Sequence, residues 1–216
     1  LRVLTAWFIN GLANGLPAVC LPLFMSHILD ASDQDQAALL FIYFLFAVIG
    51  IPIWVWLSRI LAKHTVWCMS MTLACVVFLT VPLLSAGDIF AFGLICALTG
   101  LALGSDLTLP PAIQADCADW DCLRFQKERT GTLFAYWSMS TKLALGLAVG
   151  IAFPVLSWVG LDDQTQTASI QSKTTLIVIY AIIPIVFKSI AIMLMKNFPL
   201  GLKQHQAISH RLESRI

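Results

Sequence analysis

The uncharged run AALLFIYFLFAVIGIPIWVWL, residues 37–57, decides the fold class of this chain. A membrane-spanning helix needs about 20 predominantly apolar residues. Runs of this kind occupy residues 3–28, 37–57, 66–86, 89–113, 132–160 and 174–195. They do not alternate apolar and polar residues as barrel strands do, and a backbone in lipid must satisfy its own hydrogen bonds. We therefore predict an all-α membrane protein with six transmembrane helices.

The composition supports the same class. The chain is 59% hydrophobic and 12% charged, and its mean hydropathy is +0.85, whereas soluble domains carry about 25% charged residues. Its six cysteines form no C-x-x-C pair, so we expect neither a disulfide framework nor a metal site. The chain begins at Leu1 and not at Met, which suggests a piece of a longer protein.

The distribution of basic residues predicts the topology. The N-terminus, the second and fourth loops and the C-terminal tail hold most of the 13 Lys and Arg residues: Arg2; Arg59 and Lys63; Arg124, Lys127 and Arg129; and Lys196, Lys203, Arg211 and Arg215. Basic residues favour the cytoplasmic side of a membrane. We predict that both termini are cytoplasmic, with a six-helix bundle over residues 1–196 and a cytoplasmic tail over residues 197–216.

Lys142 is the first candidate functional residue, because it lies about 16 Å into the fifth predicted helix at 1.5 Å per residue. Ser138 and Thr141 share its helix face, and Trp137 lies beside them. Ionisable residues inside membranes usually face a cavity or a charged partner and serve a function. We expect Lys142 to line a solute pathway, where it either pairs with a carboxylate or binds a polar substrate, with a structural ion pair between helices as the alternative.

Three more polar residues fall inside predicted helices: Asn10, Asn14 and Asp106. Asp106 is interpreted either as a ligand for a proton or cation or as an acceptor for a backbone amide freed by Pro110. Asn10 and Asn14 share one helix face, where helix–helix hydrogen bonding and solute contact are both open. Lys188 lies about eight residues from the cytoplasmic end of its helix, so snorkelling of its ammonium group to the surface is favoured.

A motif around the fourth loop resembles one transporter family. Residues 109–119 are LPPAIQADCAD, Trp120 follows, residues 131–137 are GTLFAYW, and Lys142 stands eleven residues after Gly131. This pattern is similar to the glycoside–pentoside–hexuronide:cation symporters, the melibiose-permease group of the major facilitator superfamily. The segment PIWVWLSR, residues 52–59, resembles another loop of these carriers. The likeness spans nearly the whole chain, as the carboxyl-terminal six-helix half of a twelve-helix carrier.

The resemblance implies alternating access around a midplane site, with Asn10, Asn14 and Asp106 near the path and with Lys142 and Ser138 close to the sugar and the cation. It implies a cytoplasmic gate of exchanging charges at Asp116 and Asp119. The family's arginine and glutamate positions hold Glu128 and Thr130 here, so the partner of Asp116 is open between Arg124 and Arg129. Leu107 replaces a family tryptophan, and galactoside specificity is not implied.

We therefore expect a cation-coupled symporter of a sugar or related polar solute, driven by H⁺ or Na⁺ and located in the cell membrane. It is not expected to be an enzyme, to need a cofactor or to bind nucleic acid, and its partner is the missing amino-terminal half. One alternative is a Mg²⁺-dependent lipid phosphotransferase or prenyltransferase that uses Asp116, Asp119 and Asp121. A non-transporting membrane scaffold is another.

Overall fold

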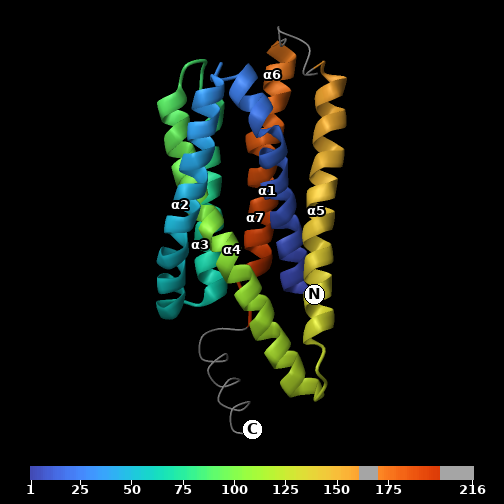
Figure 1. Cartoon of the computed structure of the whole chain (residues 1–216). Helices are drawn as coiled ribbons and strands as arrows, with labels where there is room; N and C mark the ends of the chain where they lie inside the picture. The colour runs from blue at the N-terminus through green and yellow to red at the C-terminus, as the bar shows by residue number, and fades with distance from the viewer. Residues whose placement is uncertain (161–169, 200–216) are drawn as a thin grey trace.

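The computed structural model describes residues 1–160 and 170–199 and forms helices throughout these segments, without strands (Figure 1). The elements are α1 (Arg2–His27), α2 (Asp33–Ile60), α3 (Lys63–Phe78), η1 (Val81–Leu83), α4 (Ile89–Phe125), α5 (Thr130–Trp158), α6 (Ile170–Ile177), η2 (Val178–Ile182) and α7 (Ile183–Met195). Within the described residues, six helices are long and apolar enough to cross a membrane. The predicted fold class is confirmed, while residues 200–216 of the predicted tail lie outside the described residues.

The ends of the elements have local causes. A capping box starts α2, because the Ser32 side chain accepts from the Asp35 amide and the Asp35 carboxylate accepts from the Ser32 amide. Gln126 ends α4 with a left-handed φ of 54°. The sixth span contains a π-helical turn, η2, and Pro184 follows at the first turn of α7. Pro184 has no amide hydrogen to donate, so the α-helical hydrogen-bond pattern is interrupted there and a wider π-helical turn before it is expected.

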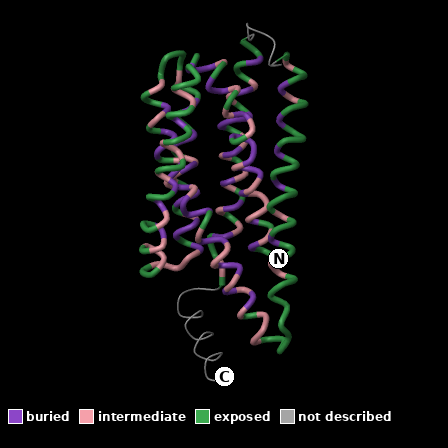
Figure 2. The backbone as a smooth tube through the Cα atoms, in the orientation of Figure 1, coloured by how far each residue is buried: buried purple, intermediate pink, exposed green. Residues whose placement is uncertain are grey.

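In Figures 1 and 2, α1 and the α6–α7 span lie in the middle of the bundle, α2 and α5 flank it on opposite sides, and α4 crosses from the side of α2 toward the start of α5. Half of the apolar window of α1 is buried, against 22% for α2 and for α5. In Figure 2 the buried residues of these flanking helices follow one side and the exposed residues the other. One face of each flanking helix therefore has no cover within the described part of the chain.

Glycines bring α2 and α4 into backbone contact. A Cβ atom added at Gly104 would lie 2.5 Å from the Ala47 carbonyl oxygen, and one at Gly50 would lie 2.6 Å from the Leu101 carbonyl oxygen. Gly100 faces the Tyr43 carbonyl oxygen even more closely. Such small-residue contacts are a common way for membrane helices to associate. They hold α4 at the position from which Asp106 reaches the interior.

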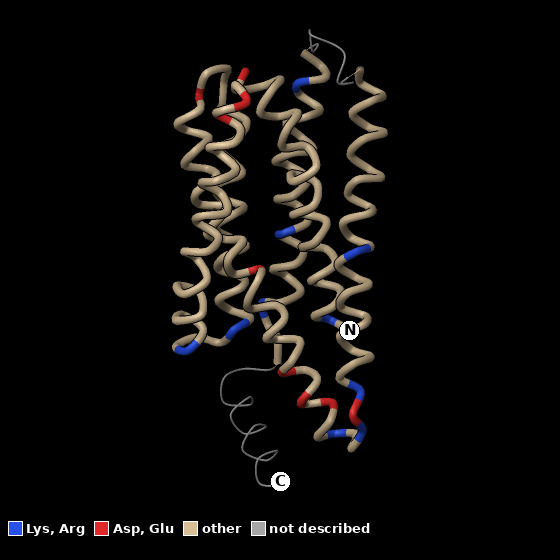
Figure 3. The backbone as a smooth tube through the Cα atoms, viewed as in Figure 1, with Lys and Arg blue, Asp and Glu red and all other residues tan. Residues whose placement is uncertain are grey.

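The described chain starts and ends on one side of the bundle. The Arg2 Nη1 atom donates to the Asn197 carbonyl oxygen at 3.1 Å, which joins the start of α1 to the end of α7. Helix α4 extends beyond the other helices at this end (Figure 1). Figure 3 shows most Lys and Arg residues here, and acidic residues without Lys or Arg around the α1–α2 and α3–α4 connections at the opposite end.

Candidate functional site

A charged cluster lies buried between four helices. The Lys188 Nζ atom donates to the Asn10 Oδ1 atom at 2.9 Å and to the Asn14 Oδ1 atom at 2.8 Å. The Asp106 Oδ2 atom lies 3.8 Å from the same ammonium group. Relative exposure is 3% for Lys188, 5% for Asp106 and 0% for Asn10. The cluster is therefore an ion pair enclosed by amide groups, from which bulk water is largely excluded.

Further hydrogen bonds fix the Asp106 carboxylate. The Trp67 indole Nε1 atom donates to its Oδ1 atom at 2.7 Å, and the Asn14 Nδ2 atom donates to its Oδ2 atom at 2.8 Å. Both carboxylate oxygens thus accept a short hydrogen bond in addition to the lysine charge. Satisfied partners of this kind are what a buried carboxylate requires, because desolvation of an unpaired charge is costly.

The sequence of α1 explains how this helix serves two neighbours. Asn10 and Asn14 are four residues apart, so they share the face toward Lys188. The adjacent face carries Gly11 and Gly15, and a Cβ atom added there would lie 2.9 Å from Ala144 Cβ and 2.8 Å from Ala148 Cβ of α5. One face of α1 thus packs closely on α5, and the adjacent face makes polar contacts with α7.

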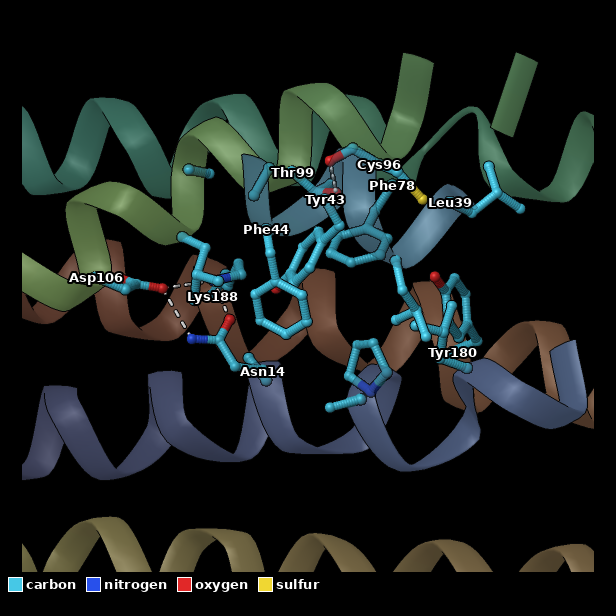
Figure 4. A pocket seen from close by; sticks show the side chains of 18 of the residues that line it. Asn14, Leu39, Tyr43, Phe44, Phe78, Cys96, Thr99, Asp106, Tyr180 and Lys188 are labelled. Carbon is cyan, nitrogen blue, oxygen red and sulfur yellow. Dashed lines mark hydrogen bonds and ion pairs between the residues drawn. The ribbon is translucent and has the colours of Figure 1, made fainter. Parts of the chain in front are cut away.

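A cavity of about 200 Å³ extends from this cluster. In Figure 4, Asp106, Asn14 and Lys188 form one end of the cavity, Phe44 and Tyr43 lie alongside it, and Tyr180 and Leu39 lie toward the other end. The polar side chains that line it are few, and most of the wall is aliphatic or aromatic. Ala18, Leu40 and Phe44 line the cavity and are also exposed, so it reaches the surface between α1 and α2. The result is an apolar slot with a charged end.

Aromatic packing closes the far end of this cavity. Tyr180, on the π-helical turn η2, stacks on Phe24 with ring centroids 4.3 Å apart. Phe78 approaches its edge at 6.0 Å, and Phe92 lies 6.3 Å away. These four rings come from four different helices and form an aromatic wall. The slot therefore has a fixed end opposite the charged cluster.

Three of the predicted pathway residues come together, namely Asn10, Asn14 and Asp106. All three contact Lys188, whose side chain points into the bundle. The prediction that its ammonium group snorkels to the surface is therefore wrong. The similar depths of Asn10 and Lys188 in their two helices are a signal that could have indicated this contact. Asn10 lies eight residues after the start of α1, Lys188 lies seven before the end of α7, and both helix ends are on the same side.

The residues predicted on α5 occupy a different place. Trp137 is buried and stacks on Trp7 with ring centroids 4.4 Å apart, and Thr141 accepts a hydrogen bond from the Trp7 indole at 2.7 Å. Ser138 and Lys142 are exposed on the outer face of α5. The expected pairing of Lys142 with a carboxylate is not formed among the described residues, where Lys188 is the lysine that pairs with Asp106. Lys142 therefore lies apart from the buried cluster.

The predicted gate charges have other partners than expected. Asp116 pairs with Lys63, whose Nζ atom lies 2.8 Å from both carboxylate oxygens. Of the two candidate partners, Arg129 pairs with Asp121 at 3.2 Å, and the Arg124 guanidinium lies 4.9 Å from the Trp120 ring. Sequence reasoning missed Lys63 because it belongs to a different helix.

Asp119 is half-buried and forms no ion pair with the residues that the structure describes. The transferase alternative requires Asp116, Asp119 and Asp121 to converge on Mg²⁺. Lys63 and Arg129 instead hold two of these carboxylates separately. No group of three or more His, Cys, Asp or Glu side chains suited to a metal occurs within residues 1–160 and 170–199. The geometry does not favour a magnesium site.

A six-helix bundle with a buried charge pair defines a multi-pass protein of a cell membrane. The chain belongs to the MFS/sugar transport protein family, whose model matches residues 1–201. It is similar to sodium-dependent lysophosphatidylcholine symporter 1 of Homo sapiens, with 26% identity over 203 residues that cover 93% of this chain and 37% of that protein. The Mus musculus symporter of the same name is 25% identical over 202 residues, covering 92% of this chain and 37% of the mouse protein.

These matches confirm the predicted major facilitator relationship, and the relatives are transporters and not enzymes. The chain spans about 37% of the length of these relatives. Their names specify a lysophospholipid and sodium, where the sequence alone suggested a sugar.

Proposed function

We propose that this chain is one six-helix half of a cation-coupled secondary transporter whose solute is an amphiphile with a charged head and an apolar chain. The observation that carries the proposal is the shape and chemistry of the cavity. Its Asp106 and Lys188 end presents both signs of charge, and the rest of its length presents aliphatic and aromatic side chains. A zwitterionic lysophospholipid has this same division between head and chain.

A sugar fits this cavity less well than an amphiphile. Each sugar hydroxyl group needs a hydrogen-bonding partner, because a buried polar group without one costs free energy. The charged and amide groups of the lining lie at the Asn14 and Asp106 end, and beyond it the lining offers three hydroxyl groups among mainly aliphatic and aromatic side chains. The names of the two similar symporters support a lysophospholipid as solute and Na⁺ as the coupling ion. We therefore favour Na⁺ over H⁺.

The cavity is smaller than a complete ligand site. Pockets that enclose a small molecule have volumes of about 300–1,000 Å³, against about 200 Å³ here. An amino-terminal six-helix half that faces this chain would complete the site and would cover surfaces that are exposed here. The outer face of α5 suits this contact, because Ser138, Lys142, Gly146 and Gly150 follow one line along it and no atom lies within 4 Å of a Cβ added at either glycine.

In this proposal the end that carries most Lys and Arg faces the cytoplasm, in accord with the positive-inside rule. The pairs of Lys63 with Asp116 and of Arg129 with Asp121 then lie at the cytoplasmic mouth. Both pairs are partly exposed. Ion pairs in such positions contribute about 0–1 kcal/mol, so they can exchange partners as the two halves rock.

The test is uptake by the full-length carrier in proteoliposomes. A lysophosphatidylcholine and a set of hexosides are offered under an inward Na⁺ gradient and, separately, under a proton gradient. We expect uptake of the lysophospholipid with Na⁺ and none of the hexosides. Ala18→Phe places a ring at the exposed mouth of the cavity and should reduce uptake at least tenfold.

The matched control is Ala38→Phe, an exposed alanine that does not line the cavity. Uptake by this variant should equal that of the unmodified carrier. Sodium-driven hexoside uptake without lysophospholipid uptake would contradict the proposed solute. Equal effects of the Ala18 and Ala38 substitutions would contradict the proposed site.

A further inference from the structure

The Lys188 ammonium group occupies a position enclosed by oxygen atoms. The Asn10 Oδ1 atom at 2.9 Å, the Asn14 Oδ1 atom at 2.8 Å and the Asp106 Oδ2 atom at 3.8 Å surround its Nζ atom. One carboxylate and two amide oxygens are the ligand types that hard cations take from proteins. An ammonium group has three donors and no acceptor, so it uses the same oxygens as such an ion would.

Other contacts hold the Asp106 and Asn14 side chains independently of Lys188. The Trp67 indole donates to Asp106 Oδ1 at 2.7 Å, and the Asn14 Nδ2 atom donates to Asp106 Oδ2 at 2.8 Å. The Asn10 Nδ2 atom is buried and has no hydrogen-bond partner among the described residues, so the hydrogen bond from Lys188 orients this amide. Contacts among α1, α3 and α4 therefore position the oxygens of Asp106 and Asn14 without the lysine, and Asn10 adds a third oxygen from α1.

We propose that Asn10, Asn14 and Asp106 form a monovalent-cation site that the tethered ammonium group of Lys188 fills. The lysine acts as a fixed cation and keeps the charged end of the cavity neutral without a bound ion. The coupling ion then has to bind elsewhere in the complete carrier. This inference concerns the oxygen set alone and holds for any transported solute.

The proposal predicts that removal of the ammonium group creates a site for Na⁺. Lys188→Met keeps most of the apolar stem and removes the charge. We expect the purified full-length Lys188→Met carrier to bind one more ²²Na⁺ per molecule than the unmodified carrier, measured by equilibrium binding in detergent. Adding Asp106→Asn to this variant removes the carboxylate and should abolish the additional ion.

Lys173→Met is the matched control, because it removes an exposed lysine that lies outside the proposed pathway. Its Na⁺ stoichiometry should equal that of the unmodified carrier. A folded Lys188→Met carrier with unchanged Na⁺ stoichiometry would overturn the proposal, as would an additional ion that persists after Asp106→Asn. The experiment compares Na⁺ binding by the variants with Na⁺ binding by the unmodified carrier, so its result does not depend on lysophospholipid transport.

Loss of folding in Lys188→Met is itself informative. In that case the variant and Lys188→Gln are solubilised in NaCl and, in parallel, in choline chloride of equal ionic strength. The proposal predicts a higher yield of monodisperse carrier in NaCl, because Na⁺ replaces the missing charge. Equally low yields in the two salts would overturn it.

Discussion

Lys188 and Asp106 show how a charge is tolerated at this depth. A charged side chain at mid-bilayer costs about 2.5–3.5 kcal/mol on insertion scales. Here the ammonium group has two amide acceptors and a carboxylate, and the carboxylate has two further donors. The pair is thus nearly saturated, and loss of one member leaves the other without compensation.

This pairing predicts strongly non-additive substitutions. Lys188→Met alone should lower the stability of the full-length carrier by about 3–5 kcal/mol in Na⁺-free buffer, because it leaves a buried carboxylate unpaired. Lys188→Met with Asp106→Asn should cost less than the lysine substitution alone, since no uncompensated charge remains. Unfolding of the purified carriers in choline chloride measures both effects. Additive costs would show that the two groups do not interact.

A second prediction concerns the ion pair between Asp116 and Lys63. A zero-length carbodiimide should couple the Asp116 carboxylate to the Lys63 amine in the full-length carrier, because the two groups are 2.8 Å apart. Peptide mapping by mass spectrometry detects the bond, which should be absent in Lys63→Arg, since a guanidinium group does not couple. A dominant cross-link from Asp116 to Lys127 would contradict the observed pairing.

Some glycines of α4 pack so closely against α2 that a side chain would not fit, whereas others leave room for one. Gly100 abuts the Tyr43 carbonyl oxygen of α2, whereas a Cβ atom at Gly93 would make an ordinary contact of 3.7 Å with Leu39. Both glycines lie on the same helix and face the same partner. They therefore form a matched pair.

We expect Gly100→Ala to lower the stability of the carrier by about 1–3 kcal/mol, because the added methyl group forces α2 and α4 apart. Gly93→Ala should be neutral or stabilising by up to about 1 kcal/mol, since alanine is the better helix former. Thermal unfolding of the purified full-length variants compares them. Similar losses in the two variants would mean that the close α2–α4 contact is not formed.

At the scale of the whole molecule, Lys142 is the predicted pathway residue that lies on the exposed face of α5, away from the buried cluster. In the proposed carrier this face meets the amino-terminal half, so Lys142→Ala should abolish Na⁺-driven uptake. Because Lys142 is exposed, the same substitution should change stability by no more than about 0.5 kcal/mol. Lys173→Ala, an exposed lysine near the start of α6, is the control and should leave uptake unchanged. Membrane insertion is checked by surface labelling. Normal accumulation by Lys142→Ala would remove this residue from the pathway.

The fold was more predictable than the site. Six apolar runs suffice to predict six helices, because lipid leaves few other options for a backbone. Asn10, Asn14 and Asp106 were identifiable because each is polar within an apolar run. Lys188 was misjudged because its distance from the helix end suggested escape to the surface, whereas its partners lie more than 80 residues away in the chain. Such pairings depend on how helices are arranged, which single-helix patterns do not encode.

The central claim is that the slot between the Asp106–Lys188 pair and the Tyr180 wall receives the apolar chain of the solute. Photolabelling of the full-length carrier tests it with a lysophosphatidylcholine that bears a diazirine at the end of its acyl chain. Mass spectrometry should place the label on cavity segments of α1, α2 or α4, at residues 13–25, 39–44 or 96–103. Ala18→Phe should greatly reduce this labelling. Label confined to the outer face of α5, or unchanged by Ala18→Phe, would contradict the account.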